Sequence, residues 1–516
     1  MSAELRREVA EVRRARARRA GLESWVGSAG LCTLVLGWFL AVSPQFAHWF
    51  VLPVFGCGVL MGKDAVEWAR RRLGALDPAG LMGLLGLHFF FLSPLLTIYY
   101  GTGLFWWAFT PPRDWRDWLG YLGILTFAGL VIYRWGWRIG ERWEARRAPT
   151  VRWRIDRRRF WVLWPLFVMA SAAFAVLLFR RTGGYEQVAA ARALLNPGMR
   201  ELNPYFGLGW MTVPAEQLGS FLWVGFVVYL WGRRGRPPWL LIGAGLAALF
   251  AVQLAVAGPR GSRMGVIFAV IEAVIIAHYA LRPVRRRFIV LGLAFVIAFS
   301  YFYAFYKIAG QAGIAALTSP TLRAQIAEAR HRTVAKVLID DLSRAGLQSY
   351  LIYRVTRPAS DYVYSLGRSY VAALLVPVPS AILPSKPRGK NYEGAAALGG
   401  RRYAEEGGIS VKVLGLAGEA MLNFSPLAIP FAFIVPGLLV GTLRRWLAGW
   451  ERTDARMLFT GVLVPLVVRV VHGDSSNLSV SFFAYAATMV PLILLSVRRE
   501  RVPTTDATVD EERSAC

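Results

Sequence analysis

Long apolar blocks alternate along the chain with short polar segments, many of which are rich in arginine. A helix rises about 1.5 Å per residue, so roughly 20 apolar residues cross a hydrocarbon core about 30 Å thick. The blocks therefore predict an all-α polytopic membrane protein with about twelve spans. The predicted spans are residues 25–43, 47–62, 79–100, 118–134, 160–179, 212–231, 238–257, 264–281, 288–307, 425–443, 457–471 and 480–497.

The basic residues between the spans predict which loops face the cytoplasm. Residues 1–23 form a basic, arginine-rich segment, and the positive-inside rule places this segment in the cytoplasm. If the loops are numbered from this cytoplasmic N-terminal segment, every even-numbered loop should also be cytoplasmic. Each of these loops carries arginine. The tail at 498–516 also falls inside, so both termini are predicted to be cytoplasmic.

Two of the predicted outer loops are long, namely 180–211 and 308–424. The longer one separates spans one to nine, within 24–307, from spans ten to twelve, within 425–497. Inside it, Ser319-Pro320 is typical of a helix start, with a capping hydroxyl followed by proline at the first helical position. Apolar residues at near-helical spacing follow and predict an amphipathic helix on the outer interface. They are Leu322, Ile326, Val334, Leu338 and Leu342.

Composition supports the membrane class and argues against several others. Hydrophobic residues make up 55% of the chain and the mean hydropathy is +0.41, which is too apolar for an ordinary soluble domain of this length. The net charge of +28 would suggest nucleic acid in a soluble protein, but here it follows from the cytoplasmic loops, and we expect no nucleic-acid partner. Cys32, Cys57 and Cys516 offer neither a disulfide framework nor a metal-ligand spacing. Phosphate-binding, zinc-protease and dinucleotide motifs are not found in the sequence, so no cofactor and no metal are predicted.

Arginines gather in the predicted outer loops. Gly258-Pro-Arg-Gly-Ser-Arg263 is a predicted hairpin between two spans and places Arg260 and Arg263 on the outer face. The guanidinium is a planar fork that suits phosphate oxygens. We therefore predict a pyrophosphate site, with a solvated basic surface as the alternative. The residues assigned to this site are Arg260, Arg263, Arg368, Lys386, Arg388 and Arg469.

Two further positions carry candidate chemistry. His472-Gly-Asp474 lies in the last outer loop, shortly after Arg469, and combines a base, an acid and a guanidinium. This is a catalytic or phosphate-binding element, or else a satisfied interfacial cluster. Glu272 lies near the middle of the eighth span, where a charge costs at least about 2.5 kcal/mol. We expect it to face the bundle interior in a structural role.

Three stretches resemble the oligosaccharide repeat-unit polymerase family (Wzy-type, which includes O-antigen and exopolysaccharide polymerases). The first is the hairpin at 258–263, which is similar to a Gly-Ser-Arg element between two spans. The second is Leu366-Gly-Arg-Ser-Tyr370, leading to Val376-Pro-Val-Pro-Ser380 and Leu383-Pro-Ser-Lys-Pro387. The third is Gly418-Glu-Ala-Met-Leu-Asn-Phe424, which is similar to the family's Gly-Glu-x-x-x-Asn-Phe element. The resemblance covers roughly residues 210–480. It departs from the family pattern at Ser425-Pro426, where a glycine is common.

The resemblance implies a metal-independent glycosyltransferase with a C-type bundle and a large periplasmic loop, in a bacterial inner membrane. Its substrate would be an undecaprenyl-pyrophosphate-linked oligosaccharide, polymerised on the periplasmic face into a surface or secreted polysaccharide. Membrane lipids, a flippase and a chain-length-regulating membrane protein are the expected partners. The basic residues would hold the pyrophosphate and stabilise its departing charge. The acceptor hydroxyl needs a base, for which Glu419 is the first candidate and His472 and Asp474 are the second.

Two other functions remain open on the sequence. An O-antigen ligase-like transferase would use similar arginines and a similar loop to move a finished glycan to another acceptor. A polysaccharide or lipid-linked oligosaccharide transporter, or flippase, would need no catalytic base, and transporters usually show repeat symmetry and broken helices at the midplane.

Overall fold

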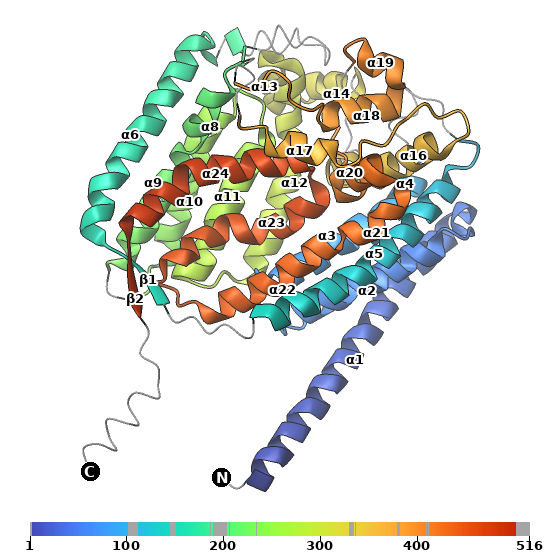
Figure 1. Ribbon diagram of the computed structural model, residues 1–516, viewed down its shortest axis with the longest axis horizontal. Coiled ribbons are helices and arrows are strands. Elements are labelled where there is room, and N and C mark those ends of the chain that lie inside the picture. The colour runs from blue at the N-terminus through green and yellow to red at the C-terminus, as the bar shows by residue number, and fades with distance from the viewer. Residues whose placement is uncertain are drawn as a thin grey trace. The chain divides into compact units, whose positions relative to one another are not determined.

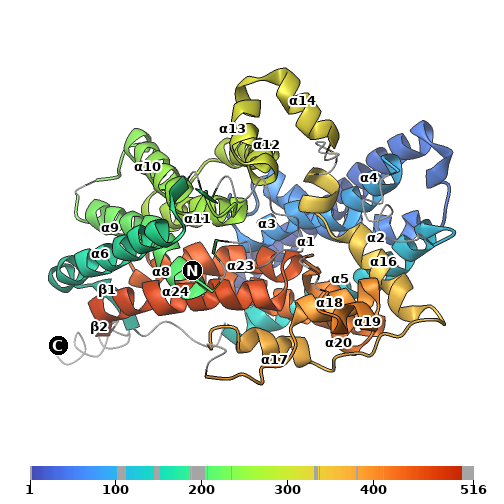
Figure 2. The same cartoon turned by 90° about the horizontal axis from the view of Figure 1, so that it is seen from above.

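The computed structural model describes residues 3–101, 112–144, 151–185, 187–188, 204–205, 207–233, 235–329, 335, 337–378, 382–408, 410 and 412–501. Its contacts divide the chain into two compact units, each of which is described by itself (Figures 1 and 2). Unit 1 comprises Met1–Gly140, Leu338–Gly441 and Val467–Ser476. Unit 2 comprises Glu141–Val337, Thr442–Leu466 and Asn477–Cys516. One of the boundaries between the units, at Val337 and Leu338, falls inside the predicted large loop at 308–424.

Unit 1 is helical wherever regular structure is described. Four helices run into unit 2, and they are α5 (Trp115–Glu144), α22 (Ile434–Gly449), α23 (Thr460–His472) and α24 (Ser475–Ser496). The other elements are α1 (Ala3–Val42), η1 (Pro44–Phe46), α2 (Val51–Ala69), α3 (Pro78–Leu87), the π-helical turn η2 (His88–Leu92), α4 (Ser93–Tyr99), the π-helical turn η4 (Val337–Asp341, divided between the units), α16 (Ala345–Thr356), α17 (Arg368–Leu374), α18 (Lys390–Gly399), α19 (Arg401–Glu405), α20 (Gly415–Phe424), η5 (Pro426–Ala428) and α21 (Ile429–Ala432).

Unit 2 combines helices with one short pair of strands. Its remaining helices are α6 (Arg157–Arg181), α8 (Gly209–Glu216), α9 (Leu218–Trp231), α10 (Trp239–Ala257), α11 (Arg263–Ile276), the π-helical turn η3 (Ala277–Leu281), α12 (Arg286–Ala309), α13 (Gln311–Thr318), α14 (Pro320–Ala329) and η6 (Ala455–Phe459). The strands β1 (Val151–Ile155) and β2 (Val497–Arg501) pair antiparallel, with Val151 opposite Arg501. This pair was not predicted from the sequence.

Ten helices among the described residues are long and apolar enough to cross a membrane. They are Arg19–Val42, Pro78–Tyr99, Trp115–Trp143, Arg157–Arg181, Gly209–Trp231, Trp239–Ala257, Arg286–Tyr306, Pro426–Gly449, Ala455–His472 and Ser475–Ser496. The all-α polytopic membrane class is thereby supported. Two predicted spans coincide with helices outside this set. The span at 47–62 lies on α2, whose last two turns carry Lys63, Asp64 and Glu67, and the span at 264–281 lies on the shorter apolar helix Gly265–Leu281.

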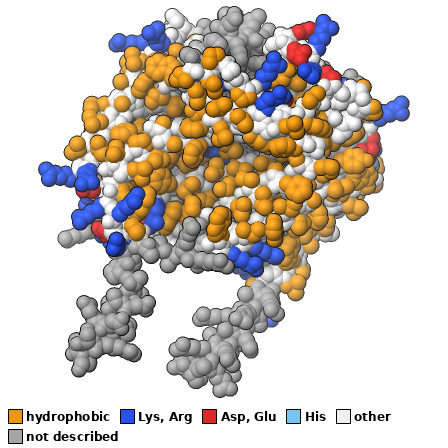
Figure 3. Space-filling model, in the orientation of Figure 1, with side chains coloured by type: hydrophobic (Ala, Val, Ile, Leu, Met, Phe, Trp, Pro, Cys, Tyr) orange, Lys and Arg blue, Asp and Glu red, His pale blue; other side chains and the backbone are white. Residues whose placement is uncertain are grey.

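The basic segment 1–23 is helical from Ala3 onward and continues into the first span as part of α1. Small residues allow the next helices to approach closely. At Gly83 of α3, an added Cβ would lie 2.6 Å from the Cβ of Asp64 in α2. Only glycine permits this separation. Close approach of two helices at small residues is a common form of packing between membrane helices. Figure 3 shows hydrophobic side chains over most of the face in view and Lys and Arg side chains mainly near its margins.

Contacts within unit 2 agree with the predicted alternation of loops. At one end, β1 pairs with β2 and the Trp153 amide donates to Asp454 at 3.3 Å, which joins three segments predicted to be cytoplasmic. At the other end, the Tyr185 hydroxyl donates to the Ala255 carbonyl at 2.7 Å, near the predicted outer hairpin. Which end faces the outside stays a prediction.

The predicted large loop is mostly helical where it is described. The expected helix start is present, since α14 begins at Pro320 and the Ser319 hydroxyl accepts the Leu322 amide at 3.4 Å. The described part of this helix runs to Ala329, and Val334 lies outside the described residues. The part of the loop in unit 1, from η4 to α20, contains the candidate site.

Candidate functional site

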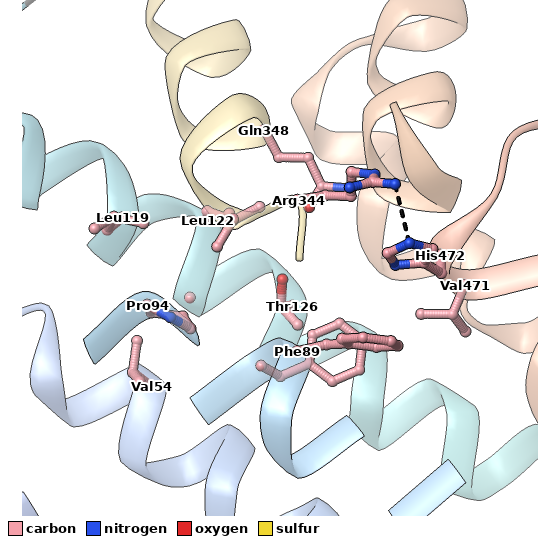
Figure 4. Close-up of a pocket in the computed structure, with 13 residues that line it drawn as sticks. Val54, Phe89, Pro94, Leu119, Leu122, Thr126, Arg344, Gln348, Val471 and His472 are labelled. Carbon is pink, nitrogen blue, oxygen red and sulfur yellow. Dashed lines mark hydrogen bonds between the residues drawn. The ribbon is translucent and has the colours of Figure 1, made fainter. Parts of the chain in front are cut away.

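A small pocket inside unit 1 brings together the C-terminal end of α23 and the start of α16 (Figure 4). Its cavity volume is about 40 Å³, which is room for a few water molecules or a group of similar size. One wall is apolar and aromatic, while the polar groups come from Arg344, Gln348, His472 and Thr126. The remaining lining residues are Val54, Phe89, Phe90, Pro94, Leu119, Leu122, Gly123, Ala345 and Val471.

Arg344 and His472 meet at the margin of this pocket. The Arg344 guanidinium donates to His472 Nε2 at 2.9 Å, because a guanidinium has no acceptor atom. His472 Nε2 is therefore unprotonated, and the neutral imidazole bears its proton on Nδ1. Phe89, from the π-helical turn η2, stacks on the imidazole with ring centroids 5.1 Å apart and planes inclined by 23°. These contacts hold the ring in one orientation.

Glu419 lies in α20 and is almost completely buried, with 2% of its surface exposed. Its carboxylate accepts hydrogen bonds from the Ser369 hydroxyl at 2.8 Å, from the Ser475 amide at 2.7 Å and from the Ser475 hydroxyl. Burial raises the pKa of this carboxyl above its usual 4.5, while the serine hydrogen bonds oppose the shift. Both carboxylate oxygens are thus occupied by protein groups.

Asn423, one turn after Glu419, ties the same network to the segment before α17. Its Oδ1 accepts from the Ser365 hydroxyl at 2.7 Å and from the Gly367 amide at 3.0 Å. Its Nδ2 donates to the Ser369 hydroxyl at 2.8 Å and to the Glu419 carbonyl at 2.9 Å. Asn423 is fully buried, and all four of its hydrogen-bonding positions are used.

The backbone held by Asn423 has an uncommon conformation. Leu366 has φ 47° and Gly367 has φ 86°, so two consecutive residues occupy the left-handed region. Glycine adopts this region freely, whereas leucine does so at a cost in free energy. The Leu366 amide donates to the Asn423 carbonyl at 2.8 Å, which helps to fix the turn.

Asp474 forms a buried ion pair with Lys390 at the start of α18. The Lys390 Nζ lies 2.7 Å from Asp474 Oδ2 and also donates to the Lys412 carbonyl at 3.1 Å. The two side chains are 9% and 0% exposed. Asp474 is therefore bound by a cation of the large loop and does not line the pocket.

The basic residues predicted from the large loop lie nearer the surface. Arg368 is half-exposed and pairs with the buried Glu393 at 3.3 Å, and burial raises the pKa of Glu393. Arg388 lies over the Tyr392 ring at 4.3 Å. Lys386 donates to the Val378 carbonyl. Each of these groups already has a protein partner.

The hairpin at 258–263 belongs to unit 2. There Arg260 forms a two-pronged ion pair with Glu216, with N–O distances of 2.7 and 2.8 Å. Arg263 is the first residue of α11, where the Ser262 hydroxyl caps the helix by accepting from the Gly265 amide at 3.2 Å. The carboxylate partner of Arg260 was not foreseen, because nothing near Glu216 in the sequence marks it as adjacent to the hairpin.

Unit 2 also holds the predicted intramembrane acid. Glu272 is half-buried in α11 and, together with Trp223 of α9 and Tyr485 of α24, lines a cavity of about 10 Å³. It thus faces other helices of its unit, as expected for a charge in a span.

In unit 1, the structure brings together the three candidate catalytic residues and both motif stretches from the large loop. Glu419, His472 and Asp474 lie on or next to the turn between α23 and α24, and Arg469 is half-buried one turn before His472. The sequence did not single out Arg344, Ser369 or Ser475. The signal available for Ser369 and Asn423 was their place within the quoted motifs.

Among the described residues, no group of three or more His, Cys, Asp or Glu side chains is arranged to hold a metal ion. In comparisons with known proteins, no family model, no curated protein and no solved structure matches the chain. The resemblance therefore rests on the short stretches quoted above.

Proposed function

We propose that the protein is a glycosyltransferase that joins prenyl-pyrophosphate-linked oligosaccharide repeat units on the outer face of a membrane. The observation that carries the proposal is the network around Glu419. It joins the stretch at 366–370, the stretch at 418–424 and the final outer loop within one compact unit. These segments are distant in sequence, and two of them carried the resemblance.

In the proposed reaction, a hydroxyl oxygen of the acceptor sugar bonds to the anomeric carbon of the donor. The bond from that carbon to the pyrophosphate oxygen breaks, and its electron pair leaves with the prenyl pyrophosphate. The acceptor proton passes to a base. His472 is the candidate that we favour, because it lines the pocket, whereas Glu419 and Asp474 do not line it and are bound by other protein groups.

Arg344 adds a reason for this assignment. Its guanidinium now occupies the lone pair of His472 Nε2. A phosphate oxygen is a stronger acceptor for arginine than a neutral imidazole, because it adds a negative charge to the interaction and allows two parallel N–H···O bonds. A pyrophosphate at the pocket would draw Arg344 away and expose Nε2 to the acceptor hydroxyl. Donor binding and base activation would then be coupled.

Glu419 and Asn423 take the role of positioning residues in this scheme. Glu419 holds Ser475, the first residue of α24, three residues after His472. The exposed guanidiniums of Arg368 and Arg388 would attract the anionic donor from solution or from the lipid surface.

The test combines a deletion strain with purified protein in lipid vesicles. Deletion should leave surface glycans as single repeat units, and the purified protein should extend the native prenyl-linked repeat unit into a ladder. Loss of the base should lower the rate roughly 10²–10⁴-fold, so we expect that effect for His472→Gln, whereas His48→Gln, at a residue that does not line the pocket, should retain activity. Long chains stranded on the carrier after deletion would indicate a ligase. Translocation of the lipid-linked substrate without chain growth would indicate a transporter and overturn the proposal.

A further inference from the structure

Large apolar side chains are exposed on unit 1 between Val363 and Ile382, outside all of the long apolar helices. Leu366 is 78% exposed and Leu374 is 67% exposed, and Val371 is also on the surface. These residues belong to the large loop, which would otherwise face water. We call the group Val363, Leu366, Val371, Leu374 and Ile382 the apolar lip.

Helix α17 is turned so that its larger apolar residues point away from the protein. Ser369, Ala372 and Ala373 are its buried residues, while Val371 and Leu374 are exposed. A short helix on a water-exposed loop is expected to show the opposite arrangement, with its apolar stripe toward the core. The outward stripe therefore needs an apolar environment outside the unit.

We propose that the apolar lip lies in the headgroup interface of the lipid bilayer and anchors this part of the large loop to the membrane. The part of the lip next to Gly367 lies against Phe424, two residues before the apolar helix Pro426–Gly449. Tyr370 and Phe424 are in ring contact at 6.4 Å, and a Cβ at Gly367 would lie 3.6 Å from the Phe424 ring.

The residues that follow Phe424 indicate how deep in the membrane the apolar lip lies. Leu427 and Phe431 are about 70% exposed at the beginning of this helix. In a membrane-spanning helix such residues face lipid at the edge of the hydrocarbon region. Since the lip adjoins Phe424, it lies at the same edge.

Charge favours lipid over a protein partner. Arg368 is half-exposed between Leu366 and Val371 of the lip, and Arg388 is exposed shortly after Ile382 in the sequence, so the segment combines cationic with apolar exposed groups. This combination is typical of elements that insert into the boundary between headgroups and acyl chains, where the cations meet lipid phosphates. The inference does not depend on the proposed reaction.

The test uses nitroxide spin labels at single introduced cysteines in the full chain, with Cys516→Ser and with the buried Cys32 and Cys57 retained. The labels are placed by Leu374→Cys and Ile382→Cys, and the matched control is Arg402→Cys, whose side chain is 91% exposed on α19. The protein is reconstituted in vesicles of phosphatidylcholine and phosphatidylglycerol. Collision rates are measured with oxygen, which concentrates in lipid, and with a water-soluble nickel chelate.

We expect both lip labels to show a several-fold higher ratio of oxygen to nickel collisions than the control label. A ratio equal to that of the control would mean that the lip is in water and would overturn the proposal. Immobile labels shielded from both reagents would mean that protein covers the lip, which would also overturn it. If either labelled variant fails to fold, Val371→Cys gives an independent position on the same face.

Discussion

The side chain of Asn423 should stabilise the turn at 365–369 more than any other single group in its surroundings. In Asn423→Ala, the Gly367 amide loses the acceptor that the structure assigns to it, and an unsatisfied buried donor costs about 1–3 kcal/mol. The lost bonds to the Ser365 and Ser369 hydroxyls add about 1 kcal/mol each. The expected loss of local stability is therefore roughly 3–5 kcal/mol.

Hydrogen exchange measured by mass spectrometry can detect this loss in the full-length protein in detergent or vesicles. A change of 1.36 kcal/mol alters an equilibrium tenfold, so exchange of the amides at 365–369 should accelerate about 10²–10³-fold or more. Peptides from α1 and α2 should exchange at the wild-type rate. In Asn423→Asp, the acceptor for Gly367 remains, but a carboxylate oxygen would face the Glu419 carbonyl in a fully buried place, so the acceleration should be at least as large as in Asn423→Ala.

The matched control is Asn391→Ala. Asn391 is half-buried in α18, and its Oδ1 makes no hydrogen bond to any part of the chain that the structure describes. Its removal should change stability by no more than about 1 kcal/mol. If Asn423→Ala accelerated exchange no more than Asn391→Ala, the idea that Asn423 fixes the turn would be refuted.

Three further predictions concern the charged groups. Asp474→Asn should destabilise unit 1 by about 3–5 kcal/mol because Lys390 stays buried without its anion, whereas Lys390→Met combined with Asp474→Leu should be nearly neutral in thermal unfolding. If the double variant regains stability but not chain growth, Asp474 has a chemical role as well. Burial raises the pKa of Glu419, so the folded state binds this proton more tightly than the unfolded chain, and the associated stability is present at low pH and lost as pH rises from about 4.5 through the folded pKa. The unfolding midpoint of Glu419→Gln should accordingly depend less on pH than that of wild type. Exchanging the pair by Arg260→Glu with Glu216→Arg should restore folding lost in either single variant if the pair is structural, as measured by the yield of monodisperse protein.

The membrane-spanning helices were predictable because their cause is local. An apolar stretch long enough to cross a bilayer must satisfy its backbone by forming a helix. The same holds for the start of α14, where Ser319 and Pro320 act on the first turn of their own helix. The position of α2 was also predicted, although the charged residues in its last turns set it apart from the longer apolar helices.

The pairings within the candidate site were not predictable in the same way. Arg344 and His472 are 128 residues apart, and one sequence contains many arginines that could have been the partner. The pair of β1 with β2 likewise depends on two chain segments that meet only in the folded unit. For Asn423, its place in the stretch at 418–424 indicated its importance better than any predicted pairing. Its hydrogen bonds reach the other motif stretch, at 366–370.

For the proposed reaction, the hydrogen bonds of Glu419 and His472 decide which of these two residues could act as the base. A general base needs a lone pair that can reach the substrate hydroxyl, either directly or through one water molecule. Glu419 meets the chemical requirement for a base, but three donors from Ser369 and Ser475 bind both of its carboxylate oxygens. His472 has a single lone pair, and the group that fills it is Arg344, a cation that an arriving phosphate can attract. The contact that a ligand could displace more easily is therefore the one between Arg344 and His472, which lies beside the pocket. If Glu419→Gln nevertheless abolished chain growth while leaving exchange at 365–369 unchanged, the carboxylate itself would be the base, and the roles of the two residues would have to be reversed.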